Sequence, residues 1–269
     1  MALQIETSVN TLSTSDQMGE AISVVRVSKN FGGENGIKAL DEASTVIKDQ
    51  EFVALIGPSG CGKSTLLRII GGLMSYEGGE VSVLGKDVVE PIDDVGIVFQ
   101  TANLLPWRTV EKNLCLGEEV RGHSPKALSD RISKMVKLLG LDAFGRHYPH
   151  ELSGGMRQRV AIGQALIRNP RVMLMDEPFG ALDALTRDHL NLELLNIWEA
   201  QRKTVLLVTH SIIEAIFLSD RVLVMSERPG RIVEEVTIDL PRPRDARSTR
   251  EMPQFNEYLL HLNHLLGVF

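Results

Sequence analysis

The feature that most constrains this chain is a glycine-rich loop between an apolar segment and a helix-forming segment. Residues 57–64 match the pattern G-x-x-x-x-G-K-[ST] in full, after the apolar run Phe52–Ile56 and before the helical pattern Ser64–Ile70. Glycines let the backbone wrap closely around a phosphate, and N–H groups at the helix start present partial positive charge to it. The motif predicts a nucleotide-phosphate site of nine consecutive residues: Gly57, Pro58, Ser59, Gly60, Cys61, Gly62, Lys63, Ser64 and Thr65.

Side chains of this loop have separate expected tasks. Lys63 is expected to reach the β- and γ-phosphates, Ser64 to give its hydroxyl oxygen to Mg²⁺, and Thr65 to contact the α-phosphate. Cys61 occupies a variable position, where a neutral filler is favoured over a redox switch. The alternative is a plain glycine-rich turn with a surface lysine, and the complete match between strand and helix argues against it. The loop by itself therefore predicts a bound nucleotide with Mg²⁺.

Five short apolar runs indicate a parallel sheet. They are apolar on both faces, as in strands covered by helices on both sides. The runs are Phe52–Ile56, Val95–Phe99, Val172–Met175, Val205–Val208 and Val222–Met225. Three further strand-like segments precede or interrupt them: Ala21–Val27, Ala43–Ile47 and Gly79–Leu84. The expected fold is α/β, with a mostly parallel P-loop (RecA-like) core, an antiparallel β subdomain and an inserted α-helical subdomain.

The strand pattern stops between residues 101 and 169. Amphipathic helical patterns, such as Ser129–Leu139 and Gly155–Ile167, take its place. We therefore expect a helical subdomain at about 101–169, inserted in an ATPase domain that spans 21–240. Residues 1–20 are expected to be a flexible lead-in. Residues 241–269 are expected to be a tail that starts as a Pro- and Arg-rich linker and ends in a helix, Phe255–Leu266.

Charge and cysteine content narrow the class of protein. The net charge of −6 argues against a nucleic-acid partner, whose binding surface is usually basic, and leaves a local basic patch open. The two cysteines, Cys61 and Cys115, lack Cys-x-x-Cys spacing and fit a reducing cytosol. The start of the chain lacks the pattern of a secretory signal, and no apolar run approaches the ~18 residues that span a bilayer. If the protein works at a membrane, another chain is expected to hold it there.

Two carboxylates follow the apolar run 172–175. Asp176 is expected to hold Mg²⁺ directly or through water, and Glu177 to polarise an attacking water. His210, after the run 204–209, is expected to orient that water and the γ-phosphate. Each signal is weak alone, because strands often end in carboxylates and a lone histidine is more often structural. They gain weight because the ends of parallel strands meet in one crevice with the phosphate loop.

The string LSGGMRQR, Leu152–Arg159, resembles the signature motif of ATP-binding-cassette ATPases. The resemblance covers about residues 21–235. It implies that Phe31 stacks on adenine, that Gln100 is the Q-loop glutamine and a contributor to the metal site, and that His210 is the switch histidine. The tripeptide Ala181-Leu182-Asp183 resembles the D-loop. The catalytic set is then Glu177, His210, Lys63 and Gln100, and the metal set is Ser64, Gln100 and Asp176.

The signature motif has a physical rationale as a second anion site. Ser153 is a natural N-cap, and Gly154 and Gly155 expose backbone N–H groups at a helix start. Two helix N-termini so far apart in the chain do not easily reach one phosphate. The resemblance implies a head-to-tail dimer, in which each ATP lies between one chain's phosphate loop and the other chain's Ser153–Gly155. A mere glycine-rich helix start would explain Ser-Gly-Gly but not the whole string.

Three less specific stretches of sequence narrow the resemblance to one subfamily. Asn103–Val110, Pro178–Asp183 and Glu227–Ile232 resemble the ATPases of bacterial nitrate, sulfonate and taurine importers. This implies a peripheral subunit at the cytoplasmic face of the inner membrane. Its implied partners are transmembrane permease subunits, a second copy of the ATPase and a periplasmic or lipid-anchored solute-binding protein, without nucleic acid. The helical subdomain is expected to carry a groove for a permease helix, and Trp107 is either plain core or adjacent to that partner.

Two other classes of function compete with import. One is a non-transport cassette that acts on nucleic acid or ribosomes, and the single motif set without a heptad run speaks against it. The other is a regulatory module that senses ATP, and the presence of both Glu177 and His210 speaks against that. The solute stays open among nitrate, sulfonate, taurine and similar small compounds.

Two details depart from the simple pattern. Gly163 stands inside a predicted helix, where it costs about 1 kcal/mol and puts local packing in question. The tail carries four arginines, which are expected to lie in a solvated linker rather than on lipid headgroups: Arg242, Arg244, Arg247 and Arg250. The segment Phe255–Phe269 is expected to pack on the core rather than on a partner.

Overall fold

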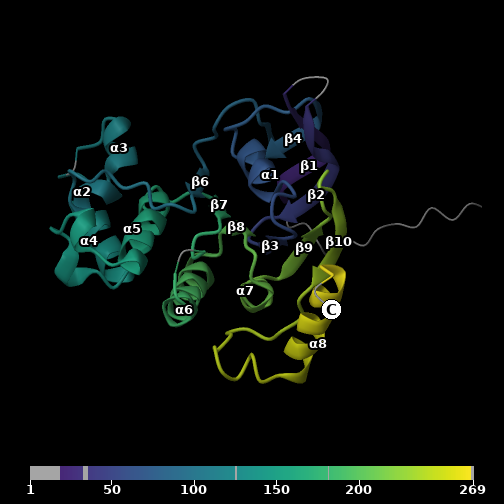
Figure 1. The fold of residues 1–269 in the computed structure, drawn as a ribbon. Coiled ribbons are helices and arrows are strands. Elements are labelled where there is room, and N and C mark those ends of the chain that lie inside the picture. Colours follow the sequence, from purple (N-terminus) through teal and green to yellow (C-terminus); the bar gives the residue numbers. More distant parts are fainter. Residues whose placement is uncertain (1–18, 33–35, 125, 181, 268–269) are drawn as a thin grey trace, which may run out of the picture.

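A six-stranded sheet forms the centre of the molecule (Figure 1). The structure is a computed structural model, and it describes residues 19–32, 36–124, 126–180 and 182–267, so most of the predicted lead-in and Ala181 lie outside it. The strand order is β10-β9-β3-β8-β7-β6, parallel except for the β10–β9 pair. The strands are β3 Phe52–Ile56, β6 Val95–Val98, β7 Val172–Asp176, β8 Thr204–Val208, β9 Arg221–Met225 and β10 Ile232–Thr237. The predicted parallel sheet is therefore confirmed, with strand ends within one residue of the apolar runs.

A second sheet is antiparallel, in the order β2-β1-β4-β5. Its strands are β1 Glu20–Phe31, β2 Ile37–Lys48, β4 Gly78–Val83 and β5 Lys86–Asp87. Buried and exposed residues alternate along much of β2, because only one face of this sheet is covered. Helix α1, Lys63–Ile70, packs against strands of both sheets and fills the space between them. The expected α/β fold with an antiparallel β part is confirmed.

The remaining helices form two groups (Figure 1). One group lies beside the β6 edge of the sheet: α2 Val110–Leu114, α3 Leu116–Val120, α4 Ser129–Leu138 and α5 Gly154–Leu166. The other covers the face opposite α1, with the C-terminal helix outermost: α6 Ala184–Gln201, α7 Ile212–Leu218 and α8 Pro253–Leu265. Within the described ranges, no helix has the length and apolarity that crossing a bilayer requires.

Alternate residues of each parallel strand serve two separate cores. In β3, Phe52, Ala54 and Ile56 join the core with α6 and α7. Val53 and Leu55 face the other core, with α1 and the antiparallel sheet. All five residues of β3 are buried, which explains why the sequence shows a continuous apolar run rather than an alternating one.

Gly163 is required by close packing of α5 against neighbouring helices. A Cβ at this position would lie 2.4 Å from Leu139 Cδ1 and 2.8 Å from Leu114 Cδ2. Both distances are below van der Waals contact, so a larger residue would force these two leucine side chains or the helix to shift. The low helix propensity of glycine is therefore offset by the packing that its missing side chain allows.

The tail arginines correct one expectation from the sequence. Arg244 is only 5% exposed, and its guanidinium donates to the carbonyls of Ile216, Phe217 and Ser219 at 2.8–3.1 Å. Burial lowers the pKa of Arg244 to about 10, so it stays charged at neutral pH. The prediction of a solvated linker is wrong here, because these arginines bind the carbonyls at the end of α7 and neighbouring carboxylates.

Two other tail arginines behave like Arg244. Arg242 pairs with Asp220 at 2.7 Å and lies over the Trp198 ring, and Arg250 pairs with Asp188 at 2.6 Å. Arg247 alone fits the solvated description, with an 88% exposed side chain. Phe255 and Leu262 of α8 are buried in the main core, so the prediction that the tail helix packs on the core is confirmed.

Candidate active site

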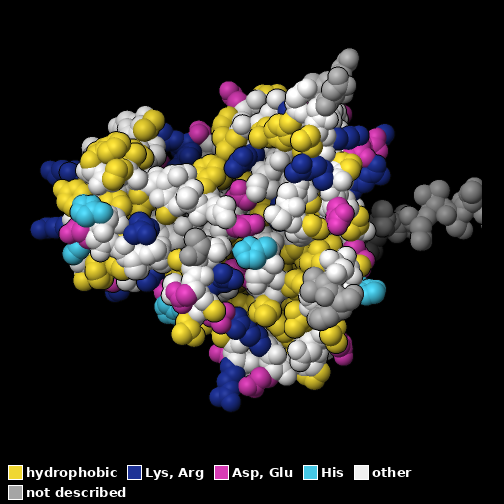
Figure 2. All heavy atoms as spheres, in the orientation of Figure 1, with side chains coloured by type: hydrophobic (Ala, Val, Ile, Leu, Met, Phe, Trp, Pro, Cys, Tyr) yellow, Lys and Arg dark blue, Asp and Glu magenta, His cyan; other side chains and the backbone are white. Residues whose placement is uncertain are grey.

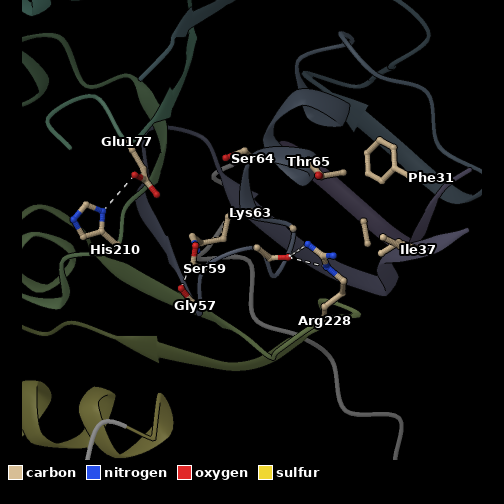
Figure 3. A pocket seen from close by; sticks show the side chains of 13 residues that line it. Phe31, Ile37, Gly57, Ser59, Lys63, Ser64, Thr65, Glu177, His210 and Arg228 are labelled. Carbon is tan, nitrogen blue, oxygen red and sulfur yellow. Dashed lines mark hydrogen bonds and ion pairs between the residues drawn. The ribbon is translucent and has the colours of Figure 1, made fainter. Parts of the chain in front are cut away.

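A cavity of about 720 Å³ lies at the carboxyl ends of the parallel strands (Figure 3). This is the edge where ligands bind in open α/β sheets. Residues from the antiparallel sheet, α1 and the loops after β3, β7, β8 and β9 line it: Phe31, Ile37, Ala39, Gly57, Ser59, Gly60, Gly62, Lys63, Ser64, Thr65, Glu177, His210 and Arg228. On the face shown in Figure 2, acidic and basic side chains are interspersed rather than sorted into one basic stripe.

The glycine-rich loop connects β3 to α1 and forms one wall of the cavity. Gly60 and Gly62 have φ values of 74° and 110°, in the left-handed region that favours glycine. The Lys63 ammonium donates to the carbonyls of Gly57 and Pro58 at 2.8 and 2.9 Å. It therefore lies within the curve of the loop, with the N–H groups at the start of α1. This is a charged and dipolar cradle for an anion.

Pro58 and Cys61 take part in the loop through the backbone and do not line the cavity. The Cys61 side chain is 1% exposed and joins the core beneath α1. Its Sγ lies 3.8 Å from Lys63 Nζ. A thiol so well covered acts as a small apolar filler, in keeping with the favoured interpretation of this position.

Ser64 and Asp176 bring two oxygen ligands together from different elements. Ser64 is the second residue of α1, Asp176 ends β7, and the Ser64 hydroxyl donates to Asp176 Oδ1 at 2.6 Å. Among the residues that the structure describes, no group of three or more His, Cys, Asp or Glu side chains is arranged to hold a metal. A hydroxyl and one carboxylate suit Mg²⁺, which takes few protein ligands and completes its shell with phosphate oxygens and water.

Glu177 stands at the meeting point of three strand ends. Its Oε2 accepts from Gln100 Nε2 at 3.3 Å and lies 3.3 Å from His210 Nδ1 (Figure 3). Its φ of 45° is in the left-handed region, which is strained for a residue with a side chain. Its N–H donates to the carbonyl of Val208 at 2.9 Å. The backbone turn and the two side chains together hold one carboxylate oxygen toward the cavity.

The structure adds Arg228, which the sequence did not assign to the site. Arg228 Nε and Nη2 donate to the Gly60 carbonyl at 3.0 and 2.8 Å, across 168 positions of sequence (Figure 3). The loop after β9, which carries Arg228, packs closely against the phosphate loop. A Cβ added to Gly230 in this loop would lie 2.1 Å from the Cys61 carbonyl oxygen. The available signal was position, since the tract follows β9 and so begins at the carboxyl edge of the sheet.

The second predicted anion site is not in this cavity. Ser153 and Gly154 are exposed at the start of α5, and the Ser153 hydroxyl accepts from the Met156 N–H at 3.2 Å. Asp183 caps α6 in the same way, accepting from the Thr186 N–H at 3.0 Å. The chain therefore gathers the phosphate loop, Asp176, Glu177 and His210 in one place and presents the Ser153–Gly155 turn elsewhere.

Trp107 is 72% exposed, which excludes the plain-core interpretation. It lies in the loop between Gln100 and α2, on the helical part of the molecule. The other interpretation from the sequence, a position beside a partner, stays a prediction.

Comparison with known sequences gives a consistent family. The family model described as "ABC transporter" matches residues 40–180. An uncharacterized ABC transporter ATP-binding protein of Methanocaldococcus jannaschii is 48% identical over 92% of each chain. An aliphatic sulfonates import ATP-binding protein of Bacillus cereus is 45% identical over 84% of this chain and 90% of its own length. A taurine import ATP-binding protein of Rhizobium johnstonii is 47% identical, over 82% and 86%.

Solved structures agree with the sequences. The dimeric structure of an ATP-binding cassette in a post-hydrolysis state, bound to ADP and Pi, superimposes with a TM-score of 0.71 at 35% identity. The match covers 81% of this chain and 98% of that chain. A dimeric structure of a bacterial ABC transporter cassette gives a TM-score of 0.72 with the same identity and coverage.

Proposed function

This chain belongs to the ABC transporter family of ATP-binding proteins and is an ATPase, and we propose that it is the ATP-hydrolysing subunit of an importer for a small solute. Its similarity to proteins named for sulfonate and taurine import supports a small anionic solute of that kind, with nitrate in the same class. The single observation that carries the hydrolytic role is Glu177, held toward the phosphate loop by residues from two further strand ends.

The residues of the cavity suit ATP with Mg²⁺. Lys63 and the N–H groups of the loop face the β- and γ-phosphates, and Thr65 lies near the α-phosphate. Phe31, 44% exposed at the other end of the cavity, offers a ring face to adenine, with Arg228 between the two ends. Ser64 and Asp176 would hold Mg²⁺, with Gln100 nearby. The metal, when bound, offsets phosphate charge.

The catalytic work falls to Glu177 and its two neighbours. The Glu177 carboxylate accepts a proton from the attacking water, which the loop geometry directs toward the γ-phosphate. His210 and Gln100 hold the carboxylate and leave one of its oxygens for that water. Because phosphoryl transfer depends on position and charge, loss of this carboxylate should reduce turnover far more than affinity.

The complete site needs a second copy of the chain. The turn Ser153–Gly155, in which Ser153 and Gly154 are exposed, would close over the ATP of the other copy in a head-to-tail dimer, with Asp183 at the same interface. The relatives of known structure are titled as dimers, which supports this arrangement. We place domain limits at 21–240 for the cassette, with about 101–169 as its helical subdomain and 241–269 as the tail.

The remaining partners are those of an importer. The helical subdomain, with exposed Trp107, would receive a cytoplasmic helix of a transmembrane permease subunit. A periplasmic or lipid-anchored solute-binding protein would deliver the solute to that permease. The chain would then act as a peripheral subunit at the cytoplasmic face of the inner membrane. Co-purification of a multi-spanning membrane protein, and loss of solute uptake in a deletion strain, test these partners.

Glu177→Gln tests the hydrolytic role directly. Turnover should fall by about 10²–10⁴, because the amide does not take up a proton, while ATP affinity is retained. Phosphate release and nucleotide titration measure the two quantities. Glu251→Gln, an exposed change in the tail, is the matched control and should leave both unchanged. Near-normal turnover of Glu177→Gln would remove Glu177 from its assigned role.

A further inference from the structure

A cluster of buried polar side chains adjoins the residue before His210. Thr209 is 2% exposed, Glu214 4% and Asn191 1%, although all three side chains are polar. They come from the end of β8, from α7 and from α6. Burying such groups is costly unless they bond to one another, so the cluster needs an explanation beyond core packing.

The sequence Ser211-Ile212-Ile213-Glu214 fits a capping box, in which the glutamate bonds back to the N–H of the cap residue. The structure departs from that pattern by inserting the Thr209 hydroxyl. Thr209 Oγ1 accepts from the Ser211 N–H at 3.0 Å and donates to Glu214 Oε2. The other half of the box is normal, since the Ser211 hydroxyl accepts from the Glu214 N–H at 3.3 Å.

In the sequence, His210 lies between Thr209 and Ser211, which are joined by the hydrogen bond from the Ser211 N–H to the Thr209 hydroxyl. On one side, Thr209 is also tied to the sheet, because its N–H donates to the Leu55 carbonyl at 3.2 Å. On the other side, Ser211 is tied to α7 as its N-cap. A histidine whose own side chain is half-exposed thus sits on a backbone that is held at both ends. Its Nδ1 reaches Glu177 from this support.

We propose that Glu214 is a positioning residue for His210, acting through the Thr209 hydroxyl and the start of α7. This inference rests on the proposed function, because His210 must matter for hydrolysis. Glu214 itself lies away from the cavity and does not line it. It would set where the imidazole meets Glu177, and so how well the attacking water is directed.

The same cluster indicates that Glu214 is uncharged. Among the described residues, neither Glu214 Oε1 nor Asn191 Oδ1 has a hydrogen-bond partner, and the Asn191 side chain adjoins the carboxyl. A proton on Glu214 would let it donate to Asn191 and satisfy two buried acceptors. Burial raises the pKa of Glu214, which agrees, while the hydrogen bond from Thr209, the nearby Arg187 and His210, and the Asn191 side chain act in the opposite direction.

Two tail arginines near α7 bind groups other than Glu214. Arg250 of the tail lies over the Phe217 ring and is paired with Asp188 of α6. Arg244 of the tail is taken up by carbonyls at the end of α7. Arg187 of α6 donates to the Leu182 carbonyl at 3.1 Å and is the cation whose charge lowers the pKa of Glu214.

Three variants of the full chain test the relay. Glu214→Ala and Thr209→Val should each lower kcat by roughly 10- to 100-fold, as a displaced catalytic group does, with ATP affinity unchanged. Glu214→Gln keeps an acceptor for Thr209 and a donor for Asn191, so it should keep kcat within about threefold of wild type. An unchanged kcat in Glu214→Ala would overturn the proposal. Low activity in Glu214→Gln would show that the charged form is needed.

A double-mutant cycle separates positioning from general stability. In a His210→Ala background, Glu214→Ala should cost little further activity, because the residue that it positions is gone. A loss of the same size in both backgrounds would mean that Glu214 acts on folding or elsewhere, and would refute the relay. Thermal unfolding of each variant, measured in parallel, shows how much of any loss comes from instability.

Stability against pH tests the uncharged state without using activity. An acid whose pKa is higher in the folded than in the unfolded chain gives stability that is complete below the unfolded value, and it is lost as pH rises through the folded pKa. Glutamine has no such dependence, so Glu214→Gln should gain stability relative to wild type as pH rises from about 4.5 to 8. A constant difference would overturn the uncharged state.

Glu118→Gln is the matched control for that measurement. Glu118 is equally buried at 4% exposed but pairs with Arg131 at 3.2 Å, so its amide variant should lose stability at neutral pH. An inactive wild-type chain would contradict the proposed function alone, because these unfolding measurements would still decide the state of Glu214.

Discussion

Two glycine-containing helix starts, those of α1 and α5, use the same physical device in opposite settings. Helix α1 begins after Gly62, without a side-chain cap, inside the cavity and with the buried Lys63 as its first residue. Helix α5 begins after Ser153, which caps it, on exposed surface outside the cavity. Both offer free N–H groups to an anion. Only the first lies in a cavity, with the Lys63 ammonium inside the loop and the Ser64–Asp176 hydrogen bond beside it.

This difference predicts that the two helix starts serve different steps, ATP binding and ATP hydrolysis. We expect the α1 start to bind phosphates within one chain, because the loop and Lys63 surround it. The α5 start lacks any counterpart on its own chain, so it should contribute only when a second copy brings an ATP to it. The comparison therefore predicts that damage at α1 removes binding, whereas damage at α5 removes hydrolysis and leaves binding intact.

The largest effect is expected from Gly154→Asp. A Cβ at Gly154 would meet Leu182 Cδ2 at 3.4 Å, an ordinary contact, and an acidic residue favours a helix N-terminus, so α5 should form normally. The new carboxylate would repel the partner's phosphates, and turnover should fall by about 10³-fold with ATP affinity retained. Phosphate release and nucleotide titration measure this. An active variant would disprove the role of the α5 start.

Lys63→Ala should weaken ATP binding by about 100-fold, because a charge-assisted contact to the phosphates is lost. Isothermal titration measures the affinity, and Gly154→Asp serves as the control that keeps it. If Lys63→Ala bound ATP with normal affinity, the phosphate loop would no longer be the binding element, and the contrast with α5 would collapse.

Mixing these two variants should restore activity that neither has alone. In a mixed head-to-tail dimer, one site combines the intact loop of one chain with the intact α5 start of the other. Random pairing at equal amounts should recover about a quarter of wild-type turnover, from one good site in half of the dimers. Absence of any recovery would argue that each chain hydrolyses ATP by itself.

The smallest effect is expected from Ser153→Ala, which removes the cap of α5. Loss of this cap should reduce the free energy of unfolding by about 1 kcal/mol, whereas α1 has no such side-chain cap to lose. Chemical denaturation measures it, and Ser153→Asp is the control that retains a capping acceptor. A change well above that range would mean that Ser153 supports more than its own helix.

Much of the fold could be predicted because its signals are local. The parallel strands were found within one residue of their ends, since a strand buried on both faces reads as a continuous apolar run. The prediction of a solvated tail was wrong because the burial of its arginines depends on residues far away in the sequence. Arg244 resembles any solvated arginine in sequence, and only the carbonyls at the end of α7, more than 20 residues earlier, determine its burial.

The residues of the site also fall into two groups, those that local sequence patterns predict and those that they do not. Lys63, Ser64 and Asp176 could be assigned from spacing and from their positions at strand ends, and the structure brings them together. Arg228 could not, because its partner Gly60 is 168 positions away and no pattern connects them. Glu214 had a local explanation as part of a capping box, which hid its contact with Thr209.

By itself the sequence determined that this chain binds a nucleotide on a parallel sheet, because the loop, the apolar runs and the helix starts are each written in short stretches of residues. Only the tertiary structure decided that the two helix starts lie apart, that Glu177 is held between Gln100 and His210, and that a buried acid supports the latter. The physical reason is range: propensity and patterning act over a few residues, whereas distances between side chains depend on how the whole chain packs.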